Sequence, residues 1–172
     1  MEKDISFWLV PKKEEKDYFQ KIIDRLALKY DGPSFEPHVT IYAGRSNIEN
    51  VISVAEEIAK NANEICMKIT GISYSDVISK TLFVTFEDSK ELTILSDELK
   101  EKSKNPSDYK LAPHLSLLYK KLKESTKKEL AREINLSYET VKLDEFVVVS
   151  ADTGVETKED VEAWKTIFRM NI

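Results

Sequence analysis

The chain has 172 residues and a formal net charge of −5, with 41% hydrophobic and 33% charged residues. This composition suits a globular protein with a sizeable core, and the negative balance disfavours an extended interface with long nucleic acid. A small anionic ligand remains compatible with it, because a local pocket can oppose the global field. The single cysteine, Cys66, and a short N-terminal apolar run with acidic neighbours predict a reduced, cytoplasmic protein without signal peptide, membrane span or internal disulfide.

Hydrophobic periodicity divides the chain into strands and helices. Asn47 is a candidate helix cap, the "DGP" at 31–33 ends the first helix, and 105–113 reads as a loop. In chain order we expect a strand at 5–10, a helix at 14–30, a strand at 38–43, a helix at 47–62, a hairpin of strands at 64–75 and 80–87, a helix at 89–104, a strand at 114–119, a helix at 124–134, and strands at 141–152 and 161–170.

This order has no linker rich in Gly, Pro or Ser, so we expect residues 1–172 to form a single domain. Each half contains one strand that begins with Pro-His and is followed directly by a helix. The sequence therefore predicts an α+β, bilobal fold, with two antiparallel sheets and flanking helices related by a pseudo-twofold axis.

The two Pro-His strands are "FEPHVTIYAG" at 35–44 and "LAPHLSLLYK" at 111–120, and they contain the only two histidines. Side chains alternate across a strand, so His38, Thr40 and Tyr42 are expected on one face. His114 and Ser116 share a face of the second strand in the same way. A face of this kind requires water or a polar cavity.

A lone histidine on a strand is more often an ordinary packed or surface residue than a catalyst. Two histidines that each follow a proline and each precede a hydroxyl by two positions are harder to attribute to chance, because proline makes up only about 5% of average sequences. We therefore expect the two strands to converge on one site. Two imidazoles across a cleft can act as general base and general acid, and two hydroxyls can donate to phosphate oxygens, without a metal.

The paired "PHVT" and "PHLS" strands resemble the 2H phosphoesterase superfamily, and "FWLVP", "GPSFEPHVTI" and "PHLSLLY" resemble its cyclic phosphodiesterase branch. The resemblance implies hydrolysis of nucleoside 2′,3′-cyclic phosphates to 2′-phosphates and of ADP-ribose 1″,2″-cyclic phosphate to ADP-ribose 1″-phosphate. It implies that His38, Thr40, His114 and Ser116 carry the two motifs and that Tyr119 contacts substrate. It also implies that His114 is the base and His38 the acid.

Three aromatic residues are further candidates for the binding site. Trp8 and Phe83 lie on the more polar faces of their strands, where they could stack on a base or ribose or could simply be half-buried packing residues. Strict alternation places Tyr119 opposite His114, so it reaches the cleft only if the strand bulges or ends before it. Trp164 reads as a core residue and Cys66 as inert packing in a strand.

The sequence favours a monomer that binds a small cyclic-phosphate nucleotide and needs no cofactor or metal, since two distant histidines without clustered carboxylates or thiols make a poor metal site. Two alternatives stay open. One is an enzyme acting on 2′,3′-cyclic phosphate at RNA ends or on 2′–5′ linkages. The other is a non-catalytic nucleotide-binding module, against which the presence of both histidines and both hydroxyls argues.

Overall fold

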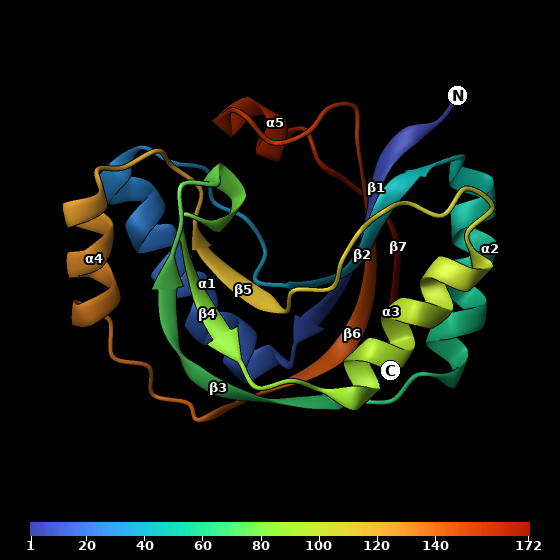
Figure 1. The fold of residues 1–172 in the computed structure, drawn as a ribbon, viewed down its shortest axis with the longest axis horizontal. Coiled ribbons are helices and arrows are strands. Elements are labelled where there is room, and N and C mark those ends of the chain that lie inside the picture. Colours follow the sequence, from blue (N-terminus) through green and yellow to red (C-terminus); the bar gives the residue numbers. More distant parts are fainter.

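The computed structural model describes residues 1–172, and its seven strands form one strongly curved antiparallel sheet with helices on its outer side (Figure 1). The elements in chain order are β1 (Lys3–Pro11), α1 (Lys13–Tyr30), β2 (Val39–Ser46), α2 (Ile48–Asn61), β3 (Ile65–Tyr74), the 3-10 turn η1 (Ile78–Lys80), β4 (Leu82–Phe86), α3 (Lys90–Lys102), β5 (His114–Leu118), α4 (Glu124–Glu133), β6 (Thr140–Ala151), α5 (Lys158–Glu162) and β7 (Lys165–Asn171).

The strand order is β1-β2-β5-β4-β3-β6-β7, and β1 also pairs with β6. The long strand β6 therefore joins the two halves, because its start pairs with β3 and the remainder pairs with β1. On the opposite side β2 and β5 meet through a single pair, Val39 and Leu115. The α+β class is confirmed, while the two expected sheets are joined into one that is almost split between the two Pro-His strands.

Two pairs of helices cover the outer face of this sheet, one pair on each half (Figure 1). α1 packs on β5 and α4 on β3 and β4, whereas α3 packs on β2 and α2 on α3 and β7. Each half of the molecule thus combines elements from both halves of the sequence. The inner, concave face is left uncovered, and it is there that the polar faces of the Pro-His strands lie.

The helices pack on the sheet through their periodic apolar residues. In α1 the predicted residues Phe19, Ile22, Ile23 and Leu26 are buried, and they join a 32-residue hydrophobic cluster with the outer faces of the strands. Asn47 caps α2 as predicted, since its side chain accepts a hydrogen bond from the backbone of Glu49. The predicted hairpin of β3 and β4 is confirmed by their antiparallel pairing.

Three details differ from the sequence-based expectations. The strand expected at 161–170 begins only at Lys165, because α5, which starts with a capping box between Thr157 and Asp160, extends to Glu162. A bulge in β1–β2 pairs Phe7 with Tyr42 but Trp8 with Thr40, which turns Tyr42 to the core side. Cys66 is exposed instead of packed. None of the helices has the length and apolarity needed to cross a membrane.

Candidate active site

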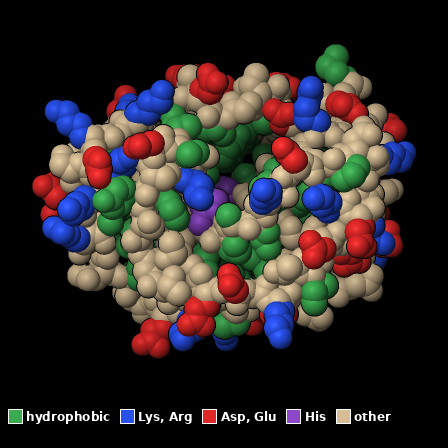
Figure 2. Space-filling model, viewed as in Figure 1, with side chains coloured by type: hydrophobic (Ala, Val, Ile, Leu, Met, Phe, Trp, Pro, Cys, Tyr) green, Lys and Arg blue, Asp and Glu red, His purple; other side chains and the backbone are tan.

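A cavity of about 480 Å³ opens on the concave side of the sheet, within the size range of small-molecule sites. Figure 2 shows histidine side chains, in purple, in this central hollow, with basic side chains near its rim. Its lining includes five of the seven predicted site residues: Trp8, His38, Thr40, His114 and Tyr119. The strand parity thus brings both histidines to one cavity even though the two strands share only one residue pair.

The two histidines are oriented by the same local hydrogen bond. Nδ1 of His38 lies 2.7 Å from the carbonyl oxygen of Glu36, and Nδ1 of His114 lies 2.7 Å from that of Ala112. In each case a proline separates the two residues and restrains the preceding residue to an extended backbone. A carbonyl only accepts, so Nδ1 carries the hydrogen in both rings and Nε2 is left as the nitrogen free to exchange a proton.

The environment of His38 disfavours its charged form. The ring is 5% exposed and stacks on Trp8, with centroids 3.7 Å apart and planes 11° apart. Burial lowers the pKa of His38 to about 4, and the nearby His114 adds to this, while the Glu36 carbonyl acts in the opposite direction. Burial also lowers the pKa of His114, with a smaller contribution from the charge of Lys80.

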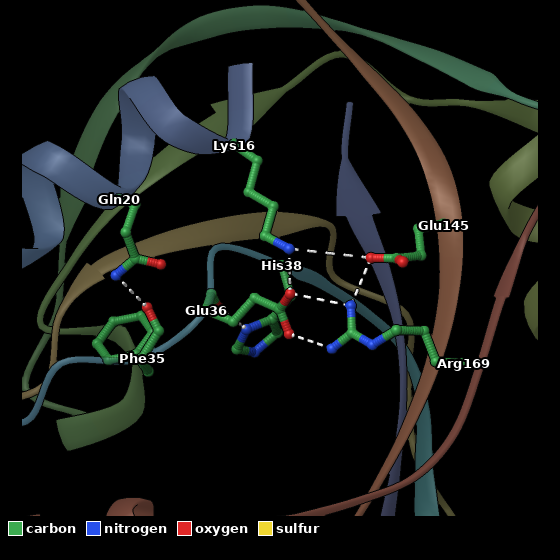
Figure 3. A network of polar contacts seen from close by, with 7 residues as sticks. All are labelled: Lys16, Gln20, Phe35, Glu36, His38, Glu145 and Arg169. Carbon is green, nitrogen blue, oxygen red and sulfur yellow. Dashed lines mark hydrogen bonds and ion pairs between the residues drawn. The ribbon is translucent and has the colours of Figure 1, made fainter. Parts of the chain in front are cut away.

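A cluster of four charged side chains supports the segment before His38 (Figure 3). The carboxylate of Glu36 receives two hydrogen bonds from Arg169, at 3.0 and 2.7 Å, and pairs with Lys16 at 2.5 Å. Arg169 also pairs with Glu145 at 2.5 Å. Burial raises the pKa of Glu36, but these hydrogen bonds outweigh it and the net pKa is lowered. The cluster ties α1, β6 and β7 to the residue whose carbonyl orients His38.

The corresponding carbonyl of the second motif has no such support, because Ala112 is exposed and has no polar side chain. Both motifs therefore have the same local hydrogen bond to the histidine ring. Only in the first motif does the residue that supplies the carbonyl have ion-pair partners. Sequence reasoning singled out the histidines and missed Glu36, Lys16 and Arg169, which come from distant parts of the chain. The only sequence signal for this difference is that Glu36 and Ala112 occupy the same position of the two motifs.

The two motif hydroxyls occupy different positions. Thr40 lines the cavity, and Tyr109, another lining residue, donates a hydrogen bond to its backbone carbonyl at 3.2 Å. Ser116 is 3% exposed, is absent from the lining, and donates to the carbonyl of Ser79 at 2.7 Å. The prediction that both hydroxyls point into the cavity therefore holds for the Thr40 position only, since the turn that carries Ser79 covers Ser116.

The rings of the two candidate stacking residues, Trp8 and Phe83, pack mainly against other side chains of the protein. Trp8 lines the cavity but is 4% exposed, with His38 stacked on it and Trp164 at its edge. Phe83 does not line the cavity, and its ring meets His114 in an edge-on contact with centroids 5.5 Å apart. The geometry favours the packing role for these two residues, each against a histidine ring, over stacking on a base or ribose.

Two other aromatic residues do reach the cavity. β5 ends at Leu118, so Tyr119 escapes the strand alternation, lines the cavity and stacks on Phe35 with centroids 4.1 Å apart. Trp164 also lines the cavity, half-buried between α5 and β7, instead of lying in the core. The charged residues Glu162 and Lys165 around it are a sequence signal against full burial. No group of three or more His, Cys, Asp or Glu side chains in residues 1–172 is arranged to hold a metal ion.

The lowered pKa of His38 makes a prediction about stability. Between pH 4 and 6.5 the unfolded chain binds a proton that the folded chain does not, so stability is complete above pH 6.5 and falls as the pH approaches 4. The shift corresponds to about 3 kcal/mol in the free energy of unfolding. Denaturant unfolding at pH 7 and pH 4 is expected to show this loss in the wild type beyond that in His38→Gln. An equal loss in both proteins contradicts the prediction.

The comparisons with known proteins agree with this geometry. The model of the 2'-5' RNA ligase superfamily matches residues 11–155. A cyclic phosphodiesterase of Arabidopsis thaliana is 24% identical, with 100% of this chain and 97% of that protein covered. Two solved structures share the fold, E. coli LigT (14% identity, TM-score 0.64, 99% and 97% covered) and TT0787 of Thermus thermophilus (12%, 0.65, 98% and 97%). The chain therefore belongs to the 2'-5' RNA ligase superfamily, the group of 2H phosphoesterases that its two Pro-His strands resemble.

Proposed function

We propose that this protein hydrolyses small cyclic phosphodiesters without a metal ion: nucleoside 2′,3′-cyclic phosphates to 2′-phosphates, and ADP-ribose 1″,2″-cyclic phosphate to ADP-ribose 1″-phosphate. The observation that carries the proposal is the pair of matched Nδ1 hydrogen bonds, which leaves Nε2 of both His38 and His114 for the same cavity. Membership of a phosphoesterase family and the similarity to a cyclic phosphodiesterase support the reaction type.

The reaction needs one proton acceptor and one proton donor on opposite sides of the phosphorus. Nε2 of one histidine takes a proton from water, whose oxygen forms a new bond to phosphorus. The bond between phosphorus and the ribose 3′ oxygen breaks, and the other histidine gives its Nε2 proton to that oxygen. The product is the 2′-phosphate, and proton exchange with solvent restores both rings. In this proposal Thr40, which lines the cavity, donates a hydrogen bond to a phosphate oxygen as the charge moves.

We assign His114 as the base and His38 as the acid, following the resemblance. The pKa of His38 is the feature that opposes this assignment, because burial keeps the ring neutral at pH 7 in the free protein. An acid role requires the bound phosphate anion to raise that pKa, which an opposite charge within a few ångströms does. The assignment of acid and base is therefore tested separately, with a substrate that has a better leaving group.

RNA ends are the second candidate substrate class. Tyr119 forms one wall of the cavity and also borders a groove of about 220 Å³ that contains Lys120, Lys121 and Lys158. Two of these lysines lie near the carboxylate of Asp31, at 3.8 and 3.7 Å, whereas Lys121 has no such partner. A phosphate preceding the cyclic end could bind in this groove. E. coli LigT, which shares the fold, has been solved with 3'-AMP and with NADP+, which supports nucleotide binding in general.

A panel assay separates these possibilities. Purified protein is incubated with 2′,3′-cyclic mononucleotides, ADP-ribose 1″,2″-cyclic phosphate and short oligoribonucleotides ending in 2′,3′-cyclic phosphate, each with and without EDTA. We expect turnover of the two small substrates at a rate that EDTA leaves within about twofold, because side chains supply the base, the acid and the oxyanion donors. Preference for the oligoribonucleotides favours the second candidate. Loss of activity in EDTA, restored by one metal, contradicts the mechanism, and no turnover of any substrate favours a binding module.

A further inference from the structure

The cavity contains positive charge that neither histidine supplies. Because both histidine pKa values are lowered, both rings are neutral in the free protein at pH 7. The remaining charged lining residues are Lys80, Lys110 and Asp4, and Asp4 has an ion-pair partner in Arg45 at 3.3 Å. A phosphodiester is an anion whose transition state spreads charge over its oxygens, so a cation in contact with it contributes directly to catalysis.

The two lysines are held very differently. Lys110 is exposed and lies in the loop between α3 and β5. Lys80 is partly buried in η1, where its backbone is fixed on both sides. Its backbone amide donates a hydrogen bond to the carbonyl of Val77, and its carbonyl accepts one from the hydroxyl of Ser75 at 2.6 Å. Hydrogen bonds to both its amide and its carbonyl therefore fix the backbone from which the Lys80 side chain extends.

The two flanking residues of Lys80 are anchored as well. The Ser79 carbonyl accepts the hydrogen bond of the motif hydroxyl Ser116, and the hydroxyl oxygen of Thr81 lies 3.0 Å from the carbonyl oxygens of both Ile78 and Lys120, which share its one hydrogen. The covered Ser116 therefore ties β5 to the turn that carries Lys80.

The ammonium group of Lys80 has no carboxylate or carbonyl partner in the protein. Its Nζ lies 5.0 Å from the ring centroid of Phe83, and that ring meets His114 edge-on, with centroids 5.5 Å apart. The face of an aromatic ring attracts a cation while leaving its donors free. Phe83 thus places a cation with unused hydrogen-bond donors beside His114 at the cavity wall.

We infer that Lys80 is a third catalytic group, which binds a non-bridging oxygen of the substrate phosphate and stabilises the transition state from the His114 side. Ser116 and Phe83 are positioning residues for it. The inference rests on the proposed function, in that it assumes a phosphate group between the two histidines. It assigns Lys80, a residue outside both histidine motifs, to the same reaction.

Lys80→Met tests this, with Lys80→Arg as the charge-retaining variant and the exposed Lys128→Met of α4 as the matched control. We expect Lys80→Met to lower kcat/KM for a 2′,3′-cyclic mononucleotide by about 10²-fold, mostly through kcat, as for loss of one oxyanion donor. Lys80→Arg should recover much of the rate and Lys128→Met all of it. Activity of Lys80→Met within about twofold of the wild type overturns the inference.

Two readouts keep this test independent of turnover. The chain has only two histidines, so the NMR titration of the His114 ring is readily followed, and removal of the Lys80 charge should raise its pKa. Binding of inorganic phosphate, measured by calorimetry, should weaken in Lys80→Met and not in Lys128→Met. If the wild type fails to hydrolyse cyclic phosphates, the proposed function fails while these readouts still test Lys80. An unchanged His114 pKa with unchanged phosphate affinity excludes the contact.

Discussion

Replacement of either His38 or His114 by alanine is expected to lower kcat/KM for a 2′,3′-cyclic mononucleotide by about 10²–10⁴-fold. This is the usual contribution of a group that transfers a proton in the transition state. Each ring is fixed by its own Nδ1 hydrogen bond, so each variant removes one proton-transfer atom from an otherwise intact cavity. Thr40→Ala should be milder, because water can partly replace a hydroxyl donor.

The double variant His38→Ala/His114→Ala should lose less than the product of the two single losses, since residues that act as a unit are not additive. His38→Asn is the matched control for orientation, because its amide nitrogen matches the position of Nδ1 and can donate to the Glu36 carbonyl while lacking a titratable nitrogen. It should be as inactive as the alanine variant. Substantial activity in His38→Asn, or a single variant within tenfold of the wild type, contradicts the paired acid–base mechanism.

A substrate with a better leaving group is expected to rescue one histidine variant and not the other. In a nucleoside cyclic phosphate whose bridging 3′ oxygen is replaced by sulfur, the leaving thiolate needs little protonation. The defect of the variant that lacks the acid should then shrink from about 10²–10⁴-fold to about tenfold or less. With His38 as the acid, His38→Ala is rescued and His114→Ala is not.

Rescue of the other variant, or of both, would also decide how the two roles are assigned. Rescue of His114→Ala would reverse the assignment, and it would agree with the lowered pKa of His38, which favours a neutral base at that position. Equal rescue of both variants would show that the acid and base roles are not divided between the rings. The wild-type rate with the sulfur substrate is the reference for each comparison.

Local sequence patterns predicted the elements well, because helix faces and strand alternation depend on residues close in the chain. The apolar stripe of α1, the Asn47 cap and the hairpin of β3 and β4 were all predicted. α5 was missed because it lies between the last two expected strands and overlaps the second by only two residues, although its Thr157–Asp160 capping box is visible in the sequence. The joining of two expected sheets into one depends on β6, whose two sets of partners lie far away in the chain.

In the candidate site, too, the features that depend on neighbouring residues were predicted, and those that depend on residues far apart in the chain were not. The period of two on each strand brought His38, Thr40 and His114 to one cavity, but a bulge removed Tyr42 from their face. Ser116 follows the pattern and is nonetheless covered, because the turn at Ser79 lies over it. Glu36, Arg169 and Lys16 come together from three separate elements or loops, and no spacing in the sequence indicates such a cluster.

The most direct test of the account is the product formed by the wild-type protein from a 2′,3′-cyclic mononucleotide in ¹⁸O-labelled water with EDTA, followed by ³¹P NMR. Attack of water on phosphorus with cleavage at the 3′ oxygen predicts a 2′-phosphate that carries one ¹⁸O atom on phosphorus, at a rate unaffected by the chelator. A 3′-phosphate, an unlabelled phosphate, or unreacted cyclic phosphate that is converted only after a metal is added would contradict metal-free hydrolysis by the two histidines.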